Sequence, residues 1–451
     1  MIIREGKSWV YAIFAVVVLS SALGNLSQTG LNAMLVTVCE EFGISTGVGQ
    51  WLTTVYMFVL GAVVPLSSYL MGRFRLKDLT LASIGIFIVG AFMAACAQGF
   101  AVLLVGRIVQ AIAAGMLLPL LQTIAMTRFP DGRKATAMGI SGVAMGFAPN
   151  IGPTIGGAMV DTLGWRSFFV LLVALSLALF AFCLFFIKRH DDASYPSGLD
   201  LFSFVLSTVG FGGILVGCSE ASSFPLTNPL VWGPILVGAA ALVWFVKRQR
   251  ALEQPLIDMG IFKSRTYTAG FIAQGLLCAS FMGITLLVPL YIEGLRGGTP
   301  LEAGMVLLPG TVAALIVNPL AGYLTDKIGA RPVGLVFGCF LAVGAVSMVF
   351  CDQATPLWVV CVMQGVRSVG VSGLIGPLTS WSLSELKGKS VGDGSSFGIA
   401  ARQTCASVGT ALMVLCVEGS LFAGITAFHA AFAASAVFAV LTLALIAKSV
   451  R

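Results

Sequence analysis

The sequence predicts an all-α polytopic membrane protein, and its composition and length carry the prediction. Of its 451 residues, 58% are hydrophobic and only 10% are charged, and the mean hydropathy is +0.98. Soluble domains usually carry about 25% charged residues and about half apolar residues. A membrane-spanning helix needs about 20 apolar residues. The chain therefore has room for about a dozen or more spans, and an ordinary cytosolic enzyme is excluded.

Fourteen apolar segments of spanning length follow one another, separated by short turns that contain charged residues, Gly or Pro. We expect membrane-spanning helices near residues 9–36, 47–71, 79–98, 101–127, 136–160, 166–187, 200–219, 230–247, 267–292, 301–324, 332–351, 356–382, 394–418 and 426–447. The apolar stretch of the first segment is too long for a signal peptide, and no cleavage site of small residues follows it. We therefore expect this segment to be the first span.

Lysine and arginine residues gather on one side of this topology. With the N-terminus inside, 21 of the 26 basic residues lie in cytoplasmic segments, two lie outside and three lie within predicted helices. Because basic residues are retained in the cytoplasm, we expect both termini to be cytoplasmic. The net charge of +7 then reflects the topology, and we expect the lipid bilayer, and no nucleic acid, as the partner of this surface.

An internal repeat relates the two ends of the chain. Residues 65–74 close the second predicted helix and residues 319–328 close the tenth, at a constant offset of 254, and Pro, Leu, Tyr and Leu coincide. Both copies end a helix on the same side, so the two halves run in parallel. The simplest division is an N-terminal six-helix bundle (1–190), two inserted helices with a linker (191–260) and a C-terminal six-helix bundle (261–451). Parallel halves suit a transporter whose central site opens to either side in turn.

The segment at residues 322–331, Gly-Tyr-Leu-Thr-Asp-Lys-Ile-Gly-Ala-Arg, follows the tenth predicted helix. Gly322 and Gly329 permit a tight turn and a close backbone approach. Asp326, followed by Lys327 and Arg331, can form charge pairs at the cytoplasmic end of the helix. We expect these residues to hold one conformation of a gate.

Glycine and proline mark the fifth predicted helix. The residues of this motif are Gly146, Pro149, Gly152, Pro153, Gly156 and Gly157. Proline removes backbone donors and glycine removes side-chain bulk, which gives a kinked helix against which a neighbour packs closely. Such a helix can flex or seal, and the alternative is a glycine-rich packing seam without a mechanistic role.

These motifs, together with residues 104–110 (Leu-Val-Gly-Arg-Ile-Val-Gln), resemble the major facilitator superfamily. Within it they resemble the fourteen-helix drug/proton antiporter group of the EmrB/QacA type, whose signature in the fifth helix is associated with exporters. The resemblance implies a major facilitator fold of 6+2+6 helices and a monomer in the bacterial plasma membrane. It also implies proton-coupled efflux of drug-like or lipophilic small molecules by alternating access. The alternative is a narrow-substrate exporter or permease of the same fold that is not driven by the usual proton antiport.

Two departures from the pattern of that group bear on mechanism. The group usually carries an acidic residue in its first helix, where this chain has Ser27. The first gating loop has Ser68, Gly72 and Arg75 where the group has Gly, Asp and Gly. We expect charge pairing at this loop to be weaker than at Asp326, or differently arranged.

Proton coupling requires a group that titrates on exposure to each side, commonly a carboxylate. Glu293, near the outer end of the ninth predicted helix, is the first candidate, followed by Glu302 and Asp161. The alternative for each is an ordinary solvated carboxylate at a helix end.

Polar residues within predicted helices suggest a substrate cavity. They are Asn25, Gln28 and Asn32 in the first helix, Arg107 and Gln110 in the fourth, Gln274 in the ninth, and Arg402 and Gln403 in the thirteenth. Arginine in the membrane is costly, so Arg107, Arg367 and Arg402 should face the interior of the bundle or a water-filled cavity. With Met116, Phe281 and Met282 as adaptable apolar contacts, this lining suits an amphiphilic organic substrate, neutral or anionic rather than dicationic.

The sequence gives little support for a metalloprotein, an enzyme or a channel. The ten cysteines form no CxxC pair, and His190 and His429 lie far apart, so we expect no metal site and no cofactor. No HExxH, GxSxG or phosphate-binding motif is present, which disfavours an enzyme, and parallel repeats with unlike gates disfavour a channel. The two inserted helices carry little polar lining, so we expect them to pack against the bundles or face lipid.

Overall fold

The computed structural model describes residues 7–188, 200–221, 228–418 and 424–450. Within these residues the chain forms fourteen α-helices and two short helical turns. The α-helices are α1 (Lys7–Phe42), α2 (Thr46–Arg73), α3 (Leu76–Ala95), α4 (Phe100–Thr127), α5 (Lys134–Leu163), α6 (Trp165–Phe186), α7 (Leu201–Glu220), α8 (Pro229–Ala251), α9 (Arg265–Pro289), α10 (Pro300–Ile328), α11 (Ala330–Met348), α12 (Leu357–Leu383), α13 (Lys389–Glu418) and α14 (Ile425–Ser449). A 3-10 turn, η1 (Met259–Lys263), precedes α9, and a π-helical turn, η2 (Leu290–Leu295), follows it. The all-α prediction is confirmed, and each predicted span overlaps one helix.

Thirteen of the described helices are long and apolar enough to cross a membrane. Local sequence sets several of their ends. Ser45 caps α2 by accepting a hydrogen bond from the amide of Val48, and Thr299 and Glu302 form a capping box at the start of α10. Gly329 has φ of +91°, which lets α11 begin immediately after α10 ends.

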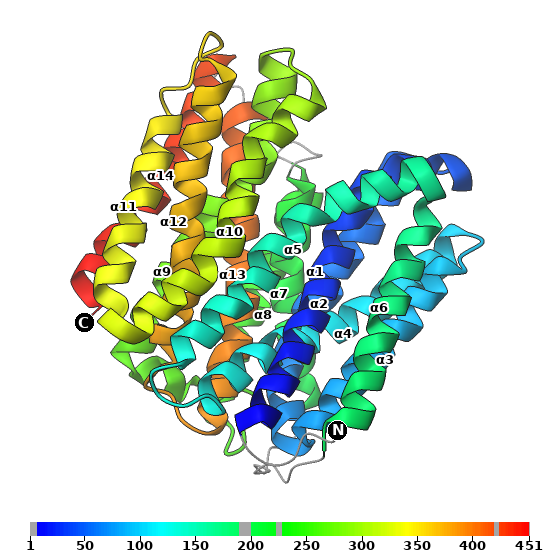
Figure 1. Cartoon of the computed structure of the whole chain (residues 1–451), viewed down its shortest axis with the longest axis vertical. Helices are drawn as coiled ribbons and strands as arrows, with labels where there is room; N and C mark the ends of the chain where they lie inside the picture. Colours follow the sequence, from blue (N-terminus) through cyan, green and yellow to red (C-terminus); the bar gives the residue numbers. More distant parts are fainter. Residues whose placement is uncertain (1–6, 189–199, 222–227, 419–423, 451) are drawn as a thin grey trace.

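The helices form two groups that lie side by side (Figure 1). We call α1–α6 the N-terminal half and α9–α14 the C-terminal half. Two seams join the halves, because α5 packs along α10 and α12, and α13 packs along α2 and α4. At one end of the molecule, which we call the gate face, α2 and α10 end while α5 and α13 begin. Toward the opposite end the two groups diverge (Figure 1).

The domain division at 190 and 260 stays a prediction, since its first boundary falls within residues 189–199, outside the described residues. The inserted helices α7 and α8 pack closely on each other, and α7 also packs on α2 and α13. A Cβ atom on Gly213 would lie 2.7 Å from the carbonyl oxygen of Pro234, so the two helix backbones nearly touch. Trp232 and Trp244 of α8 are exposed, as expected of a lipid-facing helix. In contrast, α7 covers the α2–α13 seam with one side, while Phe202 and Val205 on α7 are exposed.

A polar pair anchors this hairpin near the gate face. Asp200 accepts hydrogen bonds from the guanidinium of Arg248 (2.8 Å) and the hydroxyl of Ser203 (2.6 Å). The hydrogen bond from Arg248 is the main reason that the pKa of the Asp200 carboxyl is lowered to about 2. The start of α7 is thereby tied to the end of α8.

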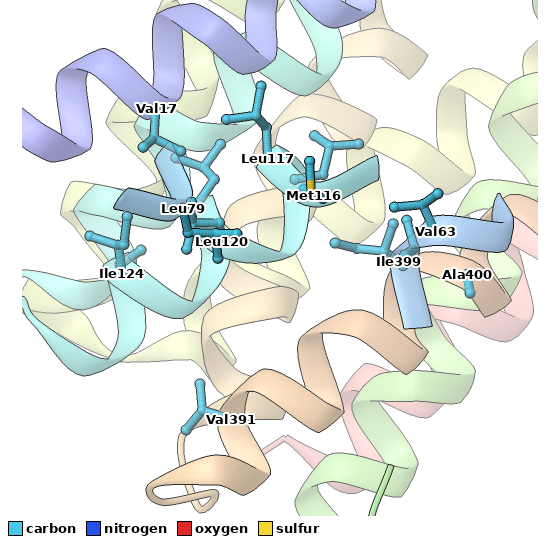
Figure 2. Close-up of a cluster of buried hydrophobic side chains, with 14 of the residues drawn as sticks. Val17, Val63, Leu79, Met116, Leu117, Leu120, Ile124, Val391, Ile399 and Ala400 are labelled. Atoms are coloured by element: carbon cyan, nitrogen blue, oxygen red, sulfur yellow. The ribbon is translucent and has the colours of Figure 1, made fainter. Parts of the chain in front are cut away.

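The largest apolar core of the protein crosses from one half to the other. Figure 2 shows Val63 of α2 and Met116 of α4 in the same cluster as Val391, Ile399 and Ala400 of α13. All five side chains are buried. Burial of apolar surface stabilises such a contact by about 25 cal/mol per Å². The α2–α13 seam is therefore closed by packing at this level of the molecule.

Candidate functional site: the gate seams and the cavity between the halves

The α5–α10 seam is built from glycine. A Cβ atom on Gly322 of α10 would overlap the carbonyl oxygen of Ala135, and one on Gly139 of α5 would overlap the carbonyl oxygen of Asn318. A Cβ on Gly142 would lie 2.7 Å from the side-chain oxygen of Asn318. The backbones of the two halves therefore meet directly, which larger residues at these positions would prevent.

Asp326 joins the halves at the end of this seam. Its carboxylate accepts hydrogen bonds from the amides of Ala135 (3.0 Å) and Thr136 (2.7 Å) and from the hydroxyl of Thr136 (2.5 Å). These amides belong to the first turn of α5, where backbone donors lack helical partners and the helix dipole favours an anion. Instead of forming the expected charge pair, Asp326 of the C-terminal half caps the first turn of α5 in the N-terminal half.

The other residues of the gating loop have separate positions. The ammonium of Lys327 lies over the ring of Tyr323, 4.7 Å from its centre, and Arg331 is exposed. Gly329 supplies the positive φ of the turn into α11. Of the predicted gating residues, Gly322 and Asp326 make the contacts between the halves.

Replacing Gly322 by Ala is expected to open this seam. The added methyl group would overlap the Ala135 carbonyl, and overpacking of this kind typically costs about 1–3 kcal/mol. Spin labels at Asp131→Cys and Arg331→Cys, two exposed positions beside the seam, should report a larger separation. Gly304→Ala on the same helix is the control, because a Cβ there meets open space. Equal distances in the two variants would contradict the role of Gly322.

The α2–α13 seam uses hydroxyl groups and one carboxylate. The hydroxyls of Ser67 and Ser396 lie 2.9 Å apart, and Ser68 donates a hydrogen bond to Asp393 of α13. The first gating loop is thus differently arranged, as expected from Ser68 and Gly72, since the carboxylate comes from α13. Asp393 lies outside the predicted thirteenth helix, which starts at residue 394. Helix α13 begins at Lys389, and Lys387 in the turn before it was a signal for an earlier start.

The glycine motif of α5 packs mainly against α1 of the same half. A Cβ atom on Gly152 would overlap the hydroxyl of Thr29, and one on Gly156 would overlap the carbonyl oxygen of Gly30. Gly146 faces Asn318 of α10, and Gly157 faces Ala33 of α1, both at ordinary contact distances. Pro153 is partly buried, and the side chain of Pro149 lies outside the described residues. The motif residues nearest the outer end of α5 therefore hold α5 to α1.

Arg107 is fully buried inside the N-terminal half. Its Nη1 donates hydrogen bonds to the carbonyl oxygen of Ser27 (3.0 Å), to the Ser27 hydroxyl (2.7 Å) and to Gln110 (3.0 Å). Its guanidinium lies over the ring of Tyr56, 4.2 Å from the centre. Ser27, at the position where an acid was expected, is thus the anchor of Arg107 on α1.

The C-terminal half contains an equivalent buried arginine. Arg367 of α12 is fully buried and donates a hydrogen bond to the carbonyl oxygen of Ser280 on α9 at 2.6 Å. In each half, an arginine of the fourth helix binds a serine carbonyl of the first helix. Together with the buried Arg402, all three intramembrane arginines face the interior, as predicted.

Arg402 belongs to a small polar cluster within the C-terminal half. It donates to the side-chain oxygen of Gln274 (2.8 Å) and to the hydroxyl of Thr379 (3.3 Å), and Gln274 donates to Ser382 (3.0 Å). These residues line a crevice of only about 10 Å³. Gln274 and Arg402 thus lie together in a tightly packed position, and their place in a substrate cavity stays a prediction.

Gln403, the next residue along α13, lines a much larger cavity between the two halves. This seam cavity has a volume of about 340 Å³, and α2, α7, α9 and α13 surround it. Its lining includes Met57, Phe58, Leu215, Val216, Met282 and Leu286, with Thr54, Thr285, Gln403, Ser407 and Thr410 as polar groups. No charged side chain is among these described lining residues. The cavity is of the size and composition of a small-molecule site, and Met282 is part of its lining.

The polar residues of α1 do not line this cavity. Asn25 donates to the carbonyl oxygens of Ser21 and Ala144, both at 3.1 Å, and so joins α1 to α5. Asn32 is exposed and accepts a hydrogen bond from Thr53 at 3.1 Å, while Gln28 is half-buried. Arg107 and Gln110 lie inside the half. The predicted cavity residues are therefore divided among several locations, and their roles toward substrate stay predictions.

The predicted coupling carboxylates lie away from the seams. Glu293 is exposed in η2, and Glu302 accepts from the amide of Thr299 at 2.9 Å as part of the cap of α10. The side chain of Asp161 lies outside the described residues. A coupling role for any of the three stays a prediction. In the part of the chain that the structure describes, no cluster of His, Cys, Asp or Glu suits a metal ion.

The two groups of membrane helices meet along one glycine-lined and one serine-lined seam, and a cavity without charged lining residues lies between them. This arrangement is typical of a membrane transporter. Residues 17–413 match the model of the Major Facilitator Superfamily, and the chain belongs to that superfamily. The protein is therefore a multi-pass transporter with the major facilitator fold.

Individual similarities agree with this family. The chain is 33% identical over 407 residues to the uncharacterized MFS-type transporter YhcA of Bacillus subtilis, which covers 90% of this chain and 75% of that protein. It is 32% identical over 405 residues to the lincomycin resistance protein LmrB of Listeria monocytogenes, covering 89% of this chain and 85% of that protein. The crystal structure of the human organic anion transporter MFSD10 has the same fold, with a TM-score of 0.70 at 13% identity over 98% of this chain and 100% of that one.

Proposed function

We propose that the protein exports uncharged amphiphilic or lipophilic compounds from a bacterial cell in exchange for protons. The seam cavity carries the proposal, because a space of about 340 Å³ lined by apolar side chains, hydroxyls and one amide suits a neutral molecule with a few polar groups. A cation would find no carboxylate among these lining residues. The relative named as a lincomycin resistance protein supports export of drug-like compounds.

The gate face gives the proposed orientation in the membrane. The gate face carries the basic segments that the sequence assigns to the cytoplasm, and both seams are closed there. In this orientation both termini are cytoplasmic and the structure is an outward-facing state. Opening of the gate face would then admit substrate from the cytoplasm, and its closure would release substrate outside, which is alternating access. The exporter-like glycine motif of α5 agrees with this direction, and a monomer contains every element of the cycle.

The test is substrate-induced proton movement in proteoliposomes. A panel of neutral, anionic, monocationic and dicationic amphiphiles is added to vesicles that hold a proton gradient and a pH-sensitive dye. Several unrelated neutral compounds should release protons saturably, and dicationic dyes should not. Silence across the panel from folded protein would contradict multidrug export and favour the narrow-substrate alternative. Release by dicationic dyes alone would contradict the uncharged-substrate proposal.

Gln403→Leu connects the activity to the cavity. Removing the amide should raise the half-saturating concentration of neutral substrates with hydrogen-bonding groups about fivefold, because one neutral hydrogen bond contributes about 1 kcal/mol. Gln254→Leu, at an exposed position of the linker after α8, is the matched control. An unchanged half-saturating concentration in Gln403→Leu, for every compound, would place the substrate elsewhere.

A further inference from the structure

Asp393 is the carboxylate that the α2–α13 seam encloses. Its side chain is fully buried. One oxygen accepts a hydrogen bond from Ser68 of α2, and the other accepts one from the amide of Asp258 at 3.0 Å. Asp258 lies immediately before η1, in the segment that leads from the inserted helices into the C-terminal half. One carboxylate therefore ties α13 to the N-terminal half and to the linker.

The surroundings of Asp393 leave its charge poorly compensated. No Lys, Arg or His side chain among the described residues forms an ion pair with it. Lys389, one turn earlier on α13, donates to the carbonyl oxygen of Pro255 at 3.1 Å. The carboxylate of Asp258 faces the amide of Gly260, and from α9 the hydroxyl of Tyr267 donates to the carbonyl oxygen of Gly394. In the described contacts, α2 brings hydroxyl and apolar groups, Ser67, Ser68 and Met71, to this part of the seam.

The internal repeat shows that the two seams are closed by different means. At the offset of 254, Ser68 corresponds to Gly322 and Gly72 corresponds to Asp326. In the α5–α10 seam the carboxylate of Asp326 binds at the partly exposed end of the helices. In the α2–α13 seam the carboxylate comes from the opposite helix and is fully enclosed. Only the second carboxylate must lose all of its water when the gate face closes.

We propose that Asp393 is a proton-controlled latch of the gate face, which binds a proton when the α2–α13 seam closes and releases it to cytoplasmic water when the seam opens. This rests on the proposed function only in taking that water to be cytoplasmic. The protonated acid keeps both contacts, since its hydroxyl can donate to the Ser68 oxygen while its carbonyl oxygen accepts from the Asp258 amide. The charged form would be enclosed without an ion-pair partner, since the nearby ammonium of Lys389 binds the carbonyl oxygen of Pro255 instead, and this is costly. Acid should therefore favour the closed gate face.

The test measures the seam and needs no substrate. Spin labels at Arg73→Cys and Lys387→Cys, exposed positions at the end of α2 and just before α13, are read by pulsed distance measurements in nanodiscs between pH 5.5 and 8.5. The exposed Cys96 and Cys339 are first replaced by Ser. In the parent protein the ratio of open to closed seam should rise with pH, by at most tenfold per pH unit for a single proton. Asp393→Asn should stay closed and lose the pH dependence.

Two further variants keep the outcome decisive. Ser68→Ala retains the carboxylate but removes its partner on α2, so it should lower the closed fraction while keeping the pH dependence. Asp326→Asn should lower the closed fraction at every pH and also keep the dependence. The latch proposal is overturned if the label distances in the parent protein do not change with pH. It is also overturned if Asp393→Asn keeps the pH dependence of the parent protein. If Asp393→Asn does not fold, loss of the pH dependence in Ser68→Ala overturns it instead. Because these distances are measured without substrate, either result leaves the export proposal to its own vesicle test.

Discussion

Replacing Asp326 by Asn is expected to shift the protein strongly toward an open gate face. The carboxylate accepts three hydrogen bonds from the first turn of α5, and an amide has one oxygen for these donors and presents an NH₂ group to the rest. Hydrogen bonds to a charged group contribute about 1.5–3 kcal/mol each. Losing part of this set should weaken the closed state by about 2–3 kcal/mol, which is roughly a 30- to 150-fold change in the equilibrium.

The distance between labels at Asp131→Cys and Arg331→Cys measures this shift, and export in vesicles should fall with it. Lys327→Gln is the matched control, because its ammonium lies on Tyr323 of the same helix. Removing that charge should leave the seam distance unchanged. A closed seam in Asp326→Asn would show that glycine packing alone holds the halves together.

Replacing Arg107 by Ala is expected to destabilise the N-terminal half. The carbonyl and hydroxyl of Ser27 and the amide oxygen of Gln110 would lose their donor inside a fully buried site. Orphaned buried groups cost about 1–3 kcal/mol each in water-soluble proteins, and less in membrane proteins, where hydrogen bonds average about 0.6 kcal/mol. With the cavity left by the side chain, we expect a loss of about 2–4 kcal/mol. The thermal unfolding midpoint in detergent should fall by several degrees.

Arg73→Ala, at an exposed position at the end of α2, should leave the midpoint unchanged. The same experiment separates two roles for Arg107. A normal unfolding midpoint together with a specific loss of substrate binding would contradict the anchor and favour a direct role toward substrate. Arg367→Ala should reproduce the destabilisation in the other half, because Arg367 binds the carbonyl oxygen of Ser280 in the same way.

Several features of the fold could be read from the sequence because they depend on local composition. Apolar runs of spanning length predicted every helix, and the repeat of residues 65–74 at 319–328 predicted that α2 and α10 end on the same side. The cost of arginine in lipid predicted that Arg107, Arg367 and Arg402 would be buried. Each of these inferences needs only one segment and the properties of the bilayer.

The site was harder to predict, because its residues come from different helices. Arg402 and Gln403 are adjacent in sequence, yet one packs against Gln274 while the other lines the seam cavity. Asp393 was missed because the start of its helix was placed five residues too late, at 394 instead of Lys389. The contribution of α7 to the cavity was also missed, because Leu215 and Val216 differ in no way from lipid-facing residues.

By itself the sequence determined the class of the protein: a helical membrane transporter with parallel halves, a glycine-lined fifth helix and an acidic gating loop. Only the tertiary structure decided that Asp326 caps α5, that Ser68 binds Asp393, and that α2, α7, α9 and α13 enclose the seam cavity. The physical reason is that lipid is as apolar as the interior of a helix bundle. The face of a membrane helix toward lipid and the face toward its neighbours therefore have similar amino-acid compositions. Spacing places residues on one face of a helix, and packing alone decides which helix that face meets.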